Sequence, residues 1–510
     1  MKKQIITLSA TACILGAGLT TQALAGAHSG LKFADYPNNC LGCHQRQFTD
    51  MHTSTHYQWI GAAPDMANQP NSQQGKLTNA VNSYCINILG DWKLCGKCHA
   101  GRGLRPDDPA AGLTNIDCLV CHSEEYALKR DRMPDGTMGV ATPTDTMVQN
   151  VHKPKRSNCL KCHAFAGGAD GVKRGDLANA LATNTDKNID VHMHVGGANL
   201  SCQSCHVFNN HKVIGKGSDL RVTDDLSRGA AVNCGTCHSK MATTTLSENG
   251  HPSSIKPHLA RVACQTCHIP TYAKVPTETH RDWRYHHDGS PADGVSGPGH
   301  PYTVKTQNLI PEYRWWNRKS NNALLHDNAE LTFDPVTGTY PTSRPQGSVN
   351  DNASKLYPFK YKTALQPMRT TSKELIALDT LEYLGKSGNV QTAIANGLRN
   401  MGYSATDTYT WVTTDTYQLL NHGVNDEDRV AKCSDCHQNP GRMNFTNRAS
   451  AGDYLGYALK TDKRTICGKC HRDRSLPSFA DLHKKHVTDK KYDCSWCHTF
   501  SRPERGLRKP

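Results

Sequence analysis

Twenty cysteines of this 510-residue chain fall into ten copies of the pattern C-x-x-C-H. Two thiols at this spacing add to the vinyl groups of a haem, and the histidine that follows becomes an axial ligand of its iron. Zinc ribbons and disulfides also use paired cysteines, but neither requires a histidine directly after the second one. The pattern therefore predicts ten covalently bound c-type haems. The attachment cysteines are Cys40, Cys43, Cys95, Cys98, Cys118, Cys121, Cys159, Cys162, Cys202, Cys205, Cys234, Cys237, Cys264, Cys267, Cys433, Cys436, Cys467, Cys470, Cys494 and Cys497. The proximal ligands are His44, His99, His122, His163, His206, His238, His268, His437, His471 and His498.

Each iron also needs a second axial ligand or an open face. The chain has 27 histidines, so enough lie outside the motifs for a second imidazole on every iron. A haem with two histidine ligands has no open coordination position and suits electron transfer. His52 and His56 are about one helical turn apart, so either could reach a ring. The distal candidates, chosen because they lie close to a motif, are His56, His192, His211, His251, His258, His422, His483 and His486.

Two features outside the motifs could carry further chemistry. Cys85 lies ten residues before Cys95, and it is either a buried free thiol or a thiolate activated by a positive neighbour. Lys173 lies in a glycine-rich stretch, residues 167–177, which could approach a flat cofactor closely. This lysine is either an axial amine ligand or part of a solvated basic loop.

The N-terminus has the pattern of an export signal. Lys2 and Lys3 precede an apolar run, and Ala23-Leu24-Ala25 forms an A-x-A cleavage site. A membrane anchor needs a longer apolar run, and a lipoprotein site at Cys13 would leave only a stub of this one. We therefore expect a signal peptide over residues 1–25, a periplasmic or extracellular protein, and no integral membrane segment after cleavage.

The elements that position these groups must be built with little aliphatic side chain. Only 37% of the residues are hydrophobic, and the mean hydropathy is −0.62. Haem faces would fill the interior instead, at one haem per roughly 48 residues of mature chain. We expect a mainly α fold with extensive irregular structure and little β, organised as a multihaem cytochrome c around a packed haem array. The motif spacing favours haem-to-haem electron transfer but does not give the packing order.

The motifs also divide the chain. We expect a seven-haem region over residues 26–275, a haem-free lobe over 276–425, an eighth haem segment over 426–461 and an appended dihaem module over 462–510. Aromatic residues such as Trp283 indicate that the lobe is ordered and packs over the haem array. Its clearest helix candidate begins at Ser372, which would cap the first turn, and runs to Leu384.

The formal charge of +14 could indicate a protein that binds nucleic acid, but the haems and the compartment argue against this. Loss of the signal peptide leaves +12, and each haem with its two propionates adds about −1 when ferric and −2 when ferrous. The total becomes roughly +2 oxidised and −8 reduced, so most of the basicity balances propionates. The basic residues are also scattered and the expected compartment is wrong, which excludes nucleic acid as a partner.

Longer strings around the motifs resemble the octahaem tetrathionate reductase-like cytochromes, over roughly residues 35–460. They are residues 40–44 with 54–59, 82–85 with 95–99, 116–122, 172–177, 263–270, 311–315, and 436–437 with 441–443. In that family one haem has a lysine distal ligand, with an asparagine and a free cysteine beside it at the substrate site. The resemblance implies that the haem on Cys95 and Cys98 is catalytic, with Asn82, Cys85 and Lys173 around it. Lys153 is the fallback lysine.

This chain departs from the family in two places. Arg174 stands where the family has a histidine after the lysine, so local ligation or charge can differ. The family has eight haems, so the motifs at Cys467 and Cys494 are additional. They would extend the electron path towards a partner cytochrome or a neighbouring subunit.

Two functions follow. The first is an extracytoplasmic decahaem reductase that receives electrons from cytochromes or quinol-linked proteins and reduces a small sulfur or nitrogen compound of the tetrathionate, nitrite or hydroxylamine type. The alternative is a non-catalytic conduit in an extracellular or metal-oxide respiratory chain. Asn82, Cys85 and Lys173 together favour the first, because a conduit does not require them. A homo-oligomer is compatible with either.

Overall fold

The computed structural model describes most of the chain. The residues described are 26–70, 73–89, 91–215, 232–238, 251, 255, 258–443, 445, 448–450, 453–456, 458–471, 479–493 and 496–499. The expected signal peptide, Cys494 and the basic C-terminal tail lie outside them. About 29% of the chain is helical and 21% is strand, with much irregular structure. The expected fold class, a multihaem cytochrome c with short helices and long irregular connections, is confirmed.

Short helices surround the motifs of the N-terminal region. The α-helices are α2 (Asn38–His52), α3 (Thr55–Gln58), α4 (Trp92–Cys95), α5 (Leu119–His122), α6 (Glu124–Lys129), α7 (Thr146–Gln149), α8 (Arg156–His163), α9 (Cys234–Cys237), α11 (His258–Arg261) and α12 (Cys264–His268). The 3-10 turns are η1 (Phe33–Asp35), η2 (Gly96–Cys98), η3 (Leu113–Asn115), η4 (Asn179–Leu181) and η5 (Cys202–Ser204). Three two-stranded ribbons pair β1 (Gly61–Ala62) with β2 (Gln73–Gln74), β3 (Asp131–Arg132) with β4 (Met138–Gly139), and β5 (Phe208–Asn209) with β6 (Lys212–Val213). Most motifs thus occupy about one helical turn, which sets the histidine at a constant offset from its cysteines.

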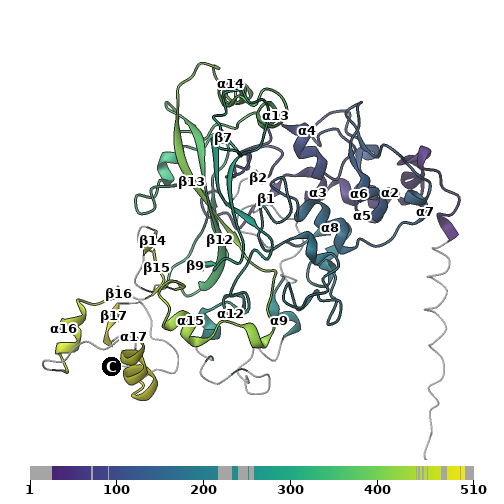
Figure 1. Ribbon diagram of the computed structural model, residues 1–510. Coiled ribbons are helices and arrows are strands. Elements are labelled where there is room, and N and C mark those ends of the chain that lie inside the picture. The colour runs from purple at the N-terminus through teal and green to yellow at the C-terminus, as the bar shows by residue number, and fades with distance from the viewer. Residues whose placement is uncertain are drawn as a thin grey trace, which may run out of the picture.

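The haem-free lobe is built on a seven-stranded sheet, which stands upright in Figure 1. Its strands are β7 (Thr277–His286), β8 (Pro301–Thr306), β9 (Glu312–Trp316), β10 (Ser320–Asn322), β11 (Tyr340–Pro345), β12 (Lys355–Arg369) and β13 (Tyr409–Leu419). The order is β10-β11-β13-β12-β7-β8, and β9 pairs with the first part of β12. β12 runs antiparallel to β13, from Phe359 opposite Leu419 to Arg369 opposite Tyr409. Most of β12 is buried, so the polar groups of this strand lie inside the molecule.

The main apolar core lies between this sheet and α13 (Thr380–Gly385) and α14 (Val390–Asn400). The helix expected from Ser372 to Leu384 forms only in its last part. Ser372 lies in a turn and Lys373 adopts φ 60°, and the helix begins only where Asp379 caps α13 by accepting a bond from the Glu382 amide. Residues 375–378 are four consecutive apolar side chains, and all are buried. A helix that packs on one side would bury only some of these four side chains, whereas a non-helical segment between β12 and α14 buries all four of them.

The C-terminal part leaves the sheet lobe and projects to the lower left of Figure 1. It contains η10 (Glu427–Arg429), α15 (Cys433–His437), β14 (Arg448–Ser450), β15 (Asp453–Tyr454), β16 (Ala458–Leu459), α16 (Lys463–Gly468), α17 (Phe479–His483), the π-helical turn η11 (Lys484–Asp489) and β17 (His498–Thr499). The lobe also holds η9 (Ala329–Thr332). Within the described residues, no helix has the length and apolar character needed to cross a membrane.

Candidate functional site: paired histidines and a cationic loop

Histidine rings face one another in pairs throughout the molecule. Nine of the histidines that follow motif cysteines lie opposite a second histidine, with ring centroids 5.9–6.3 Å apart. The pairs are His44 with His28, His122 with His211, His163 with His56, His206 with His422, His238 with His192, His268 with His251, His437 with His258, His471 with His486, and His498 with His483.

These distances fit an iron atom between each pair of rings. A metal–imidazole bond is about 2 Å long and the ring centre lies about 1 Å beyond the nitrogen, so two rings on one metal are about 6 Å apart. Several of these rings are held through Nδ1, which leaves Nε2 for a metal. Nδ1 of His122 contacts the His152 carbonyl at 2.8 Å, and Nδ1 of His206 contacts the Ile214 carbonyl at 2.9 Å.

All eight distal candidates chosen from the sequence lie in these pairs. His52, the alternative to His56, packs on Tyr57 instead of facing a motif histidine. His28 is the partner that sequence reasoning missed. It lies just after the expected cleavage site, and nothing in its neighbourhood distinguishes it from a surface histidine.

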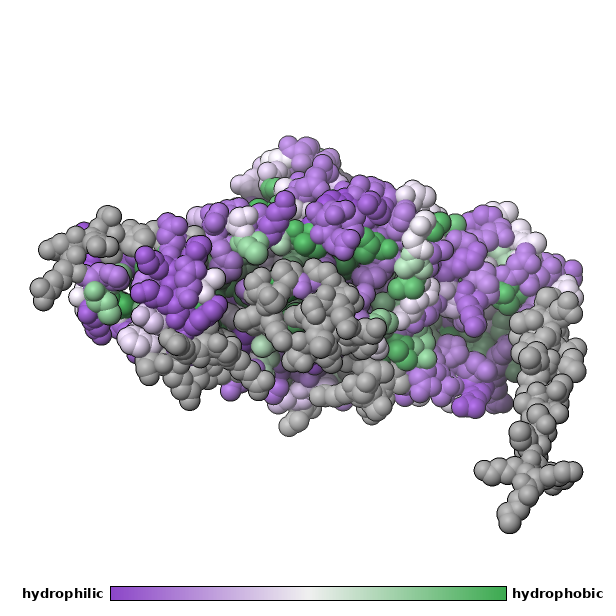
Figure 2. Space-filling model, turned by 90° about the horizontal axis from the view of Figure 1, so that it is seen from below, coloured by the Kyte–Doolittle hydropathy of each residue, from purple (hydrophilic) through white to green (hydrophobic). Residues whose placement is uncertain are grey.

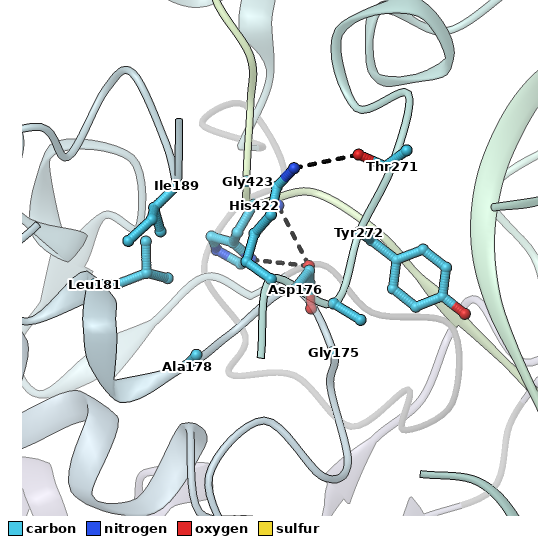
Figure 3. A pocket seen from close by; sticks show the side chains of 11 residues that line it. Gly175, Asp176, Ala178, Leu181, Ile189, Thr271, Tyr272, His422 and Gly423 are labelled. Carbon is cyan, nitrogen blue, oxygen red and sulfur yellow. Dashed lines mark hydrogen bonds and ion pairs between the residues drawn. The ribbon is translucent and has the colours of Figure 1, made fainter. Parts of the chain in front are cut away.

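His422 illustrates how distant segments build one pair. Figure 3 shows His422 and Asp176 in a small cavity beside Tyr272 and Leu181. The Asp176 carboxylate is 3.0 Å from Nδ1 of His422 and accepts bonds from the backbone amides of Asn421 and His422. Burial raises the pKa of Asp176, but Arg174 and His422 lower it more strongly, so the carboxylate is ionised and orients the imidazole.

His99 differs from the other motif histidines, because no histidine ring faces it among the described residues. Its ring packs against Tyr57, Trp59 and Trp92, with centroids 5.1–5.2 Å apart. Its Nε2 lies 2.5 Å from the Tyr57 carbonyl oxygen, and burial lowers its pKa to about 4. Ligation of an iron through Nε2 requires this ring to leave the carbonyl. The motif at Cys95 is therefore structurally distinct, and as arranged it is the one that does not fit a second imidazole.

A tight loop presents Cys85 beside this motif. The Asn82 side-chain oxygen accepts bonds from the amides of Tyr84 and Cys85, at 2.8 and 3.1 Å. Its amide group donates to the Ile86 carbonyl at 3.0 Å. Ile86 adopts φ 57°, a left-handed conformation that costs a β-branched residue about 1–3 kcal/mol. Asn82 thus holds a strained loop in shape, which is a positioning role that the sequence did not reveal.

Cys85 is a partly exposed thiol beside a buried guanidinium. Desolvation by the surrounding protein raises its pKa, and Arg281 opposes this shift through charge and a hydrogen bond. Cys85 also lies near enough to Cys95 to raise the pKa of that thiol. Of the two interpretations from the sequence, the geometry supports a protonated thiol with a cation poised beside it.

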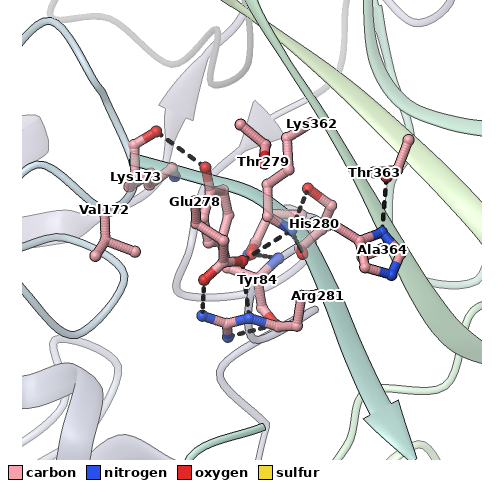
Figure 4. Close-up of polar contacts among 12 residues, drawn as sticks. Tyr84, Val172, Lys173, Glu278, Thr279, His280, Arg281, Lys362, Thr363 and Ala364 are labelled. Carbon is pink, nitrogen blue, oxygen red and sulfur yellow. Dashed lines mark hydrogen bonds and ion pairs between the residues drawn. The ribbon is translucent and has the colours of Figure 1, made fainter. Parts of the chain in front are cut away.

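Tyr84 joins the loop to a buried cluster of charges, shown in Figure 4. Its hydroxyl donates to the Lys173 carbonyl at 2.9 Å, and the Lys173 ammonium lies 5.7 Å from its ring centroid. Lys362 lies 4.3 Å and Arg281 5.5 Å from the same centroid. Lys173, 8% exposed, is therefore brought to the same place as Asn82 and Cys85. Lys153 is exposed in the chain before α8 and belongs to no such cluster.

One carboxylate balances part of this charge. Glu278 on β7 accepts two bonds from Arg281, at 2.9 and 2.7 Å, and pairs with Lys362 at 3.2 Å. Lys360 donates to the carbonyls of Val172 and Lys173, and burial lowers its pKa far below the ordinary value. Burial also lowers the pKa of Lys362, to about 8. Sequence reasoning did not single out Glu278, Lys360 and Lys362. The signal that could have found them is the presence of charged side chains within two strands that are otherwise buried.

Two comparisons indicate the kind of protein that this chain resembles. A family model described as bacterial cytochrome c matches residues 302–440. The crystal structure of an octahaem cytochrome c from Shewanella oneidensis superposes with a TM-score of 0.69 and 26% identity, and covers 84% of this chain and 97% of that one. The chain has the fold of a multihaem cytochrome c.

The resemblance to octahaem cytochromes stated from the sequence is thereby confirmed, and so is the covalent attachment of c-type haem. The sequence of this cytochrome is also similar to an uncharacterized protein of Archaeoglobus fulgidus. The two are 27% identical over 227 residues, which cover 34% of this chain and 73% of that one. Electron transfer between redox partners is the activity that the comparisons support.

Proposed function

We propose that this cytochrome carries ten haems outside the cytoplasm and uses them to reduce a small sulfur or nitrogen compound beside Cys85. The observation that carries the proposal is a convergence. The loop with Asn82 and Cys85, the amine of Lys173 and the cation of Arg281 all meet beside the one motif whose histidine has no imidazole partner among the described residues.

A row of neighbouring motifs supports electron delivery to this place. The Cys98 sulfur interacts with that of Cys162, and Cys159 interacts with Cys202. Further along, the neighbouring sulfur pairs are Cys205 with Cys237, Cys234 with Cys264, and Cys267 with Cys436. Haems bound at these motifs would lie side by side and pass single electrons, which is the chemistry that they supply.

The residues of the site select the substrate. Arg281 is cationic, and so is Lys362 below its pKa of about 8, whereas burial favours the neutral form of Lys360. With Glu278 as the carboxylate, the cluster keeps a small excess of positive charge. Such a field attracts a small anion. Tetrathionate and nitrite are anions of this size, and hydroxylamine is a neutral alternative. Tetrathionate accepts two electrons and yields two thiosulfate ions, so no proton is required, whereas nitrite reduction consumes protons that the Cys85 thiol can hold.

Lys173 has the second role. A buried amine can bind a metal and can also be displaced, because desolvation favours its neutral form. In this proposal Lys173 leaves the site when substrate binds, Asn82 keeps the loop in place, and Arg281 holds the anion. Residues 26–275, 276–425, 426–461 and 462–510 serve as seven-haem region, lobe, eighth haem segment and dihaem module, after removal of residues 1–25 as a signal peptide.

Spectroscopy of the oxidised protein tests the proposal. We expect nine low-spin haems with two histidine ligands and one haem with a different ligand set. The variant Cys85→Ala should lower substrate turnover by more than tenfold while these spectra stay unchanged. Ten bis-histidine haems, with turnover unaffected by Cys85→Ala, would contradict the proposal.

That result would instead favour a conduit that passes electrons to an outer acceptor. The nine histidine pairs favour this second function, because they leave no open coordination position.

A further inference from the structure

The last two histidine pairs form a module at one end of the molecule, here residues 458–499. β16 pairs with β17, and the Lys460 amide donates to the Cys497 carbonyl at 2.9 Å, which ties the start of the module to the tenth motif. His498 faces His483, and His471 faces His486. The module therefore holds two complete ligand pairs.

The tenth motif, not the ninth, lies next to the rest of the protein. His483, the partner of His498, lies near His437 of the eighth motif. The sulfur of Cys497 interacts with those of Cys467 and Cys470 in the ninth motif. The order in space is thus eighth, tenth, ninth, although the order in the chain is eighth, ninth, tenth.

Apolar contacts join the residues just before the module to the lobe. Leu455 packs with Trp315 and Met443, and its carbonyl accepts a bond from Nε1 of Trp315 at 3.0 Å. Phe445 stacks on His437 with centroids 5.7 Å apart. The chain is thereby anchored to the lobe and the eighth motif shortly before the module begins.

Charge is distributed unevenly between the module and the rest of the chain. Residues 458–510 contain fourteen lysines and arginines against six acidic residues, a formal +8. Residues 26–457, which are eight times longer, have a formal +4. Each ferric haem adds about −1, so the C-terminal segment keeps about +6 while the remainder falls to about −4. The described residues of the module alone contain eight basic side chains and four aspartates.

The exposed face of the tenth motif has an apolar tip within these charges. Trp496, between the two attachment cysteines of the motif, is 45% exposed and stacks on Tyr492 at 5.3 Å. Leu459 is 44% exposed. Lys460 and Lys469 are exposed and lie near the Cys497 sulfur. Figure 2 shows the surface at this end, on the left, as mostly hydrophilic with small apolar areas.

We propose that this face, with Trp496 at its centre and Lys460 and Lys469 beside it, is the docking site of an acidic redox protein that donates electrons to the cytochrome. Opposite charges steer such a partner to the module, and the negative remainder of the molecule repels it elsewhere. An exposed aromatic residue inside a charged rim is the usual centre of a protein interface.

The direction of transfer rests on the proposed function. A reductive site near α4 needs electrons from outside, and in Figure 1 the module lies at the lower left, whereas α4 lies on the other side of the sheet lobe. In each encounter the donor loses one electron and the module gains it. A haem held by the His483–His498 pair would pass the electron to a haem held by the His258–His437 pair, and from there to the row of motifs described above.

Stopped-flow reduction of the full haem-loaded chain tests the docking site. Photoreduced flavodoxin, an acidic flavin protein, serves as the probe, and photoreduced lumiflavin serves as a small neutral donor. We expect the double variant Lys460→Glu/Lys469→Glu to slow reduction by flavodoxin about tenfold at low salt and to weaken its salt dependence. Reduction by lumiflavin should not change.

The matched control carries the same charge change on the lobe, as Lys305→Glu/Lys319→Glu, and should stay within twofold of the parent. Trp496→Ala should slow reduction by flavodoxin without altering its salt dependence. Equal rates for the module variant and the lobe control would overturn the proposal. A second outcome would also overturn it. If the module variant lost binding to phosphatidylglycerol vesicles but was still reduced by flavodoxin at the parent rate, the module would be assigned to a membrane surface.

The spatial order has its own readout. His483→Ala removes one ligand of the pair next to the body, and His486→Ala is the matched change in the outer pair. We expect His483→Ala to make reduction by flavodoxin biphasic, with a slow phase for most of the absorbance, and His486→Ala to leave most of it fast. If the parent protein showed no substrate turnover with lumiflavin as the electron donor, the proposed function would be contradicted. The docking results would be unaffected, because they measure reduction of the haems and not turnover.

Discussion

Asp176 and His422 contact each other across 246 positions of sequence, with the carboxylate oxygen 3.0 Å from Nδ1 of the imidazole. The aspartate lies between the fourth and fifth motifs, and the histidine follows the last strand of the sheet lobe. This contact orients the ring that faces His206. The lobe without motifs thus completes a histidine pair of the N-terminal region.

Replacement of Asp176 by asparagine should raise the reduction potential of one centre. The anion beside Nδ1 makes the imidazole a stronger donor, and a neutral amide removes that effect. A potentiometric titration followed by absorbance would detect one component moving to higher potential. Asp186→Asn, a change at an exposed turn of the same region, is the control, and identical titration curves for both variants would contradict the role of Asp176.

Arg281→Gln should slow alkylation of Cys85 by iodoacetamide. Arg281 is the main group that lowers the pKa of this thiol, and the thiolate is the reactive form. A rise of one pKa unit reduces the thiolate fraction about tenfold. Mass spectrometry of the haem-loaded protein gives the rate, since the other cysteines of the mature chain lie in haem motifs. Arg284→Gln, which removes an exposed partner of Asp282 on the same strand, should leave the rate unchanged.

The ion pair of Arg130 and Asp117 should contribute strongly to stability. Both side chains are buried, the Nε–Oδ2 distance is 2.6 Å, and Arg130 also donates to the carbonyls of His99 and Gly101. Arg130→Met leaves a buried carboxylate without its cation, which costs about 3–5 kcal/mol. Urea denaturation followed by circular dichroism measures the effect. Arg105→Met, at an exposed pair with Asp107, should cost less than about 1 kcal/mol, and equal losses would refute the prediction.

Gly397 of α14 should not tolerate a side chain. A Cβ atom there would meet the Ala377 backbone oxygen at less than van der Waals distance, inside the main core. Gly397→Ala should therefore lower the stability of the lobe by about 1–3 kcal/mol through overpacking. At Gly385 of α13 the nearest atom is a leucine methyl at 3.5 Å, so Gly385→Ala should be close to neutral. Thermal unfolding gives the midpoint temperatures of the two variants. Equal midpoints would contradict the prediction, because they would show that the core rearranges to accept the added methyl group.

The lobe shows where sequence reasoning reached its limit. Trp283 and its neighbours predict an ordered region, but of the helix predicted over residues 372–384 only the part from Thr380 onwards is helical. A short apolar run does not distinguish a buried helix from a buried extended segment. The position of α14 decides between them, and that position depends on the sheet.

The sequence by itself determined the class of protein and its cofactor, because C-x-x-C-H places two thiols and a ligand within five residues and needs nothing distant. Only the tertiary structure decided which histidine faces which, and that the tenth motif lies between the eighth and the ninth. It also decided how Arg281, Glu278 and Lys362 surround Tyr84 and Cys85. The physical reason is that a ligand pair or a charge cluster depends on distances between side chains. Segments as far apart as Asp176 and His422 meet only when the lobe packs against the N-terminal region.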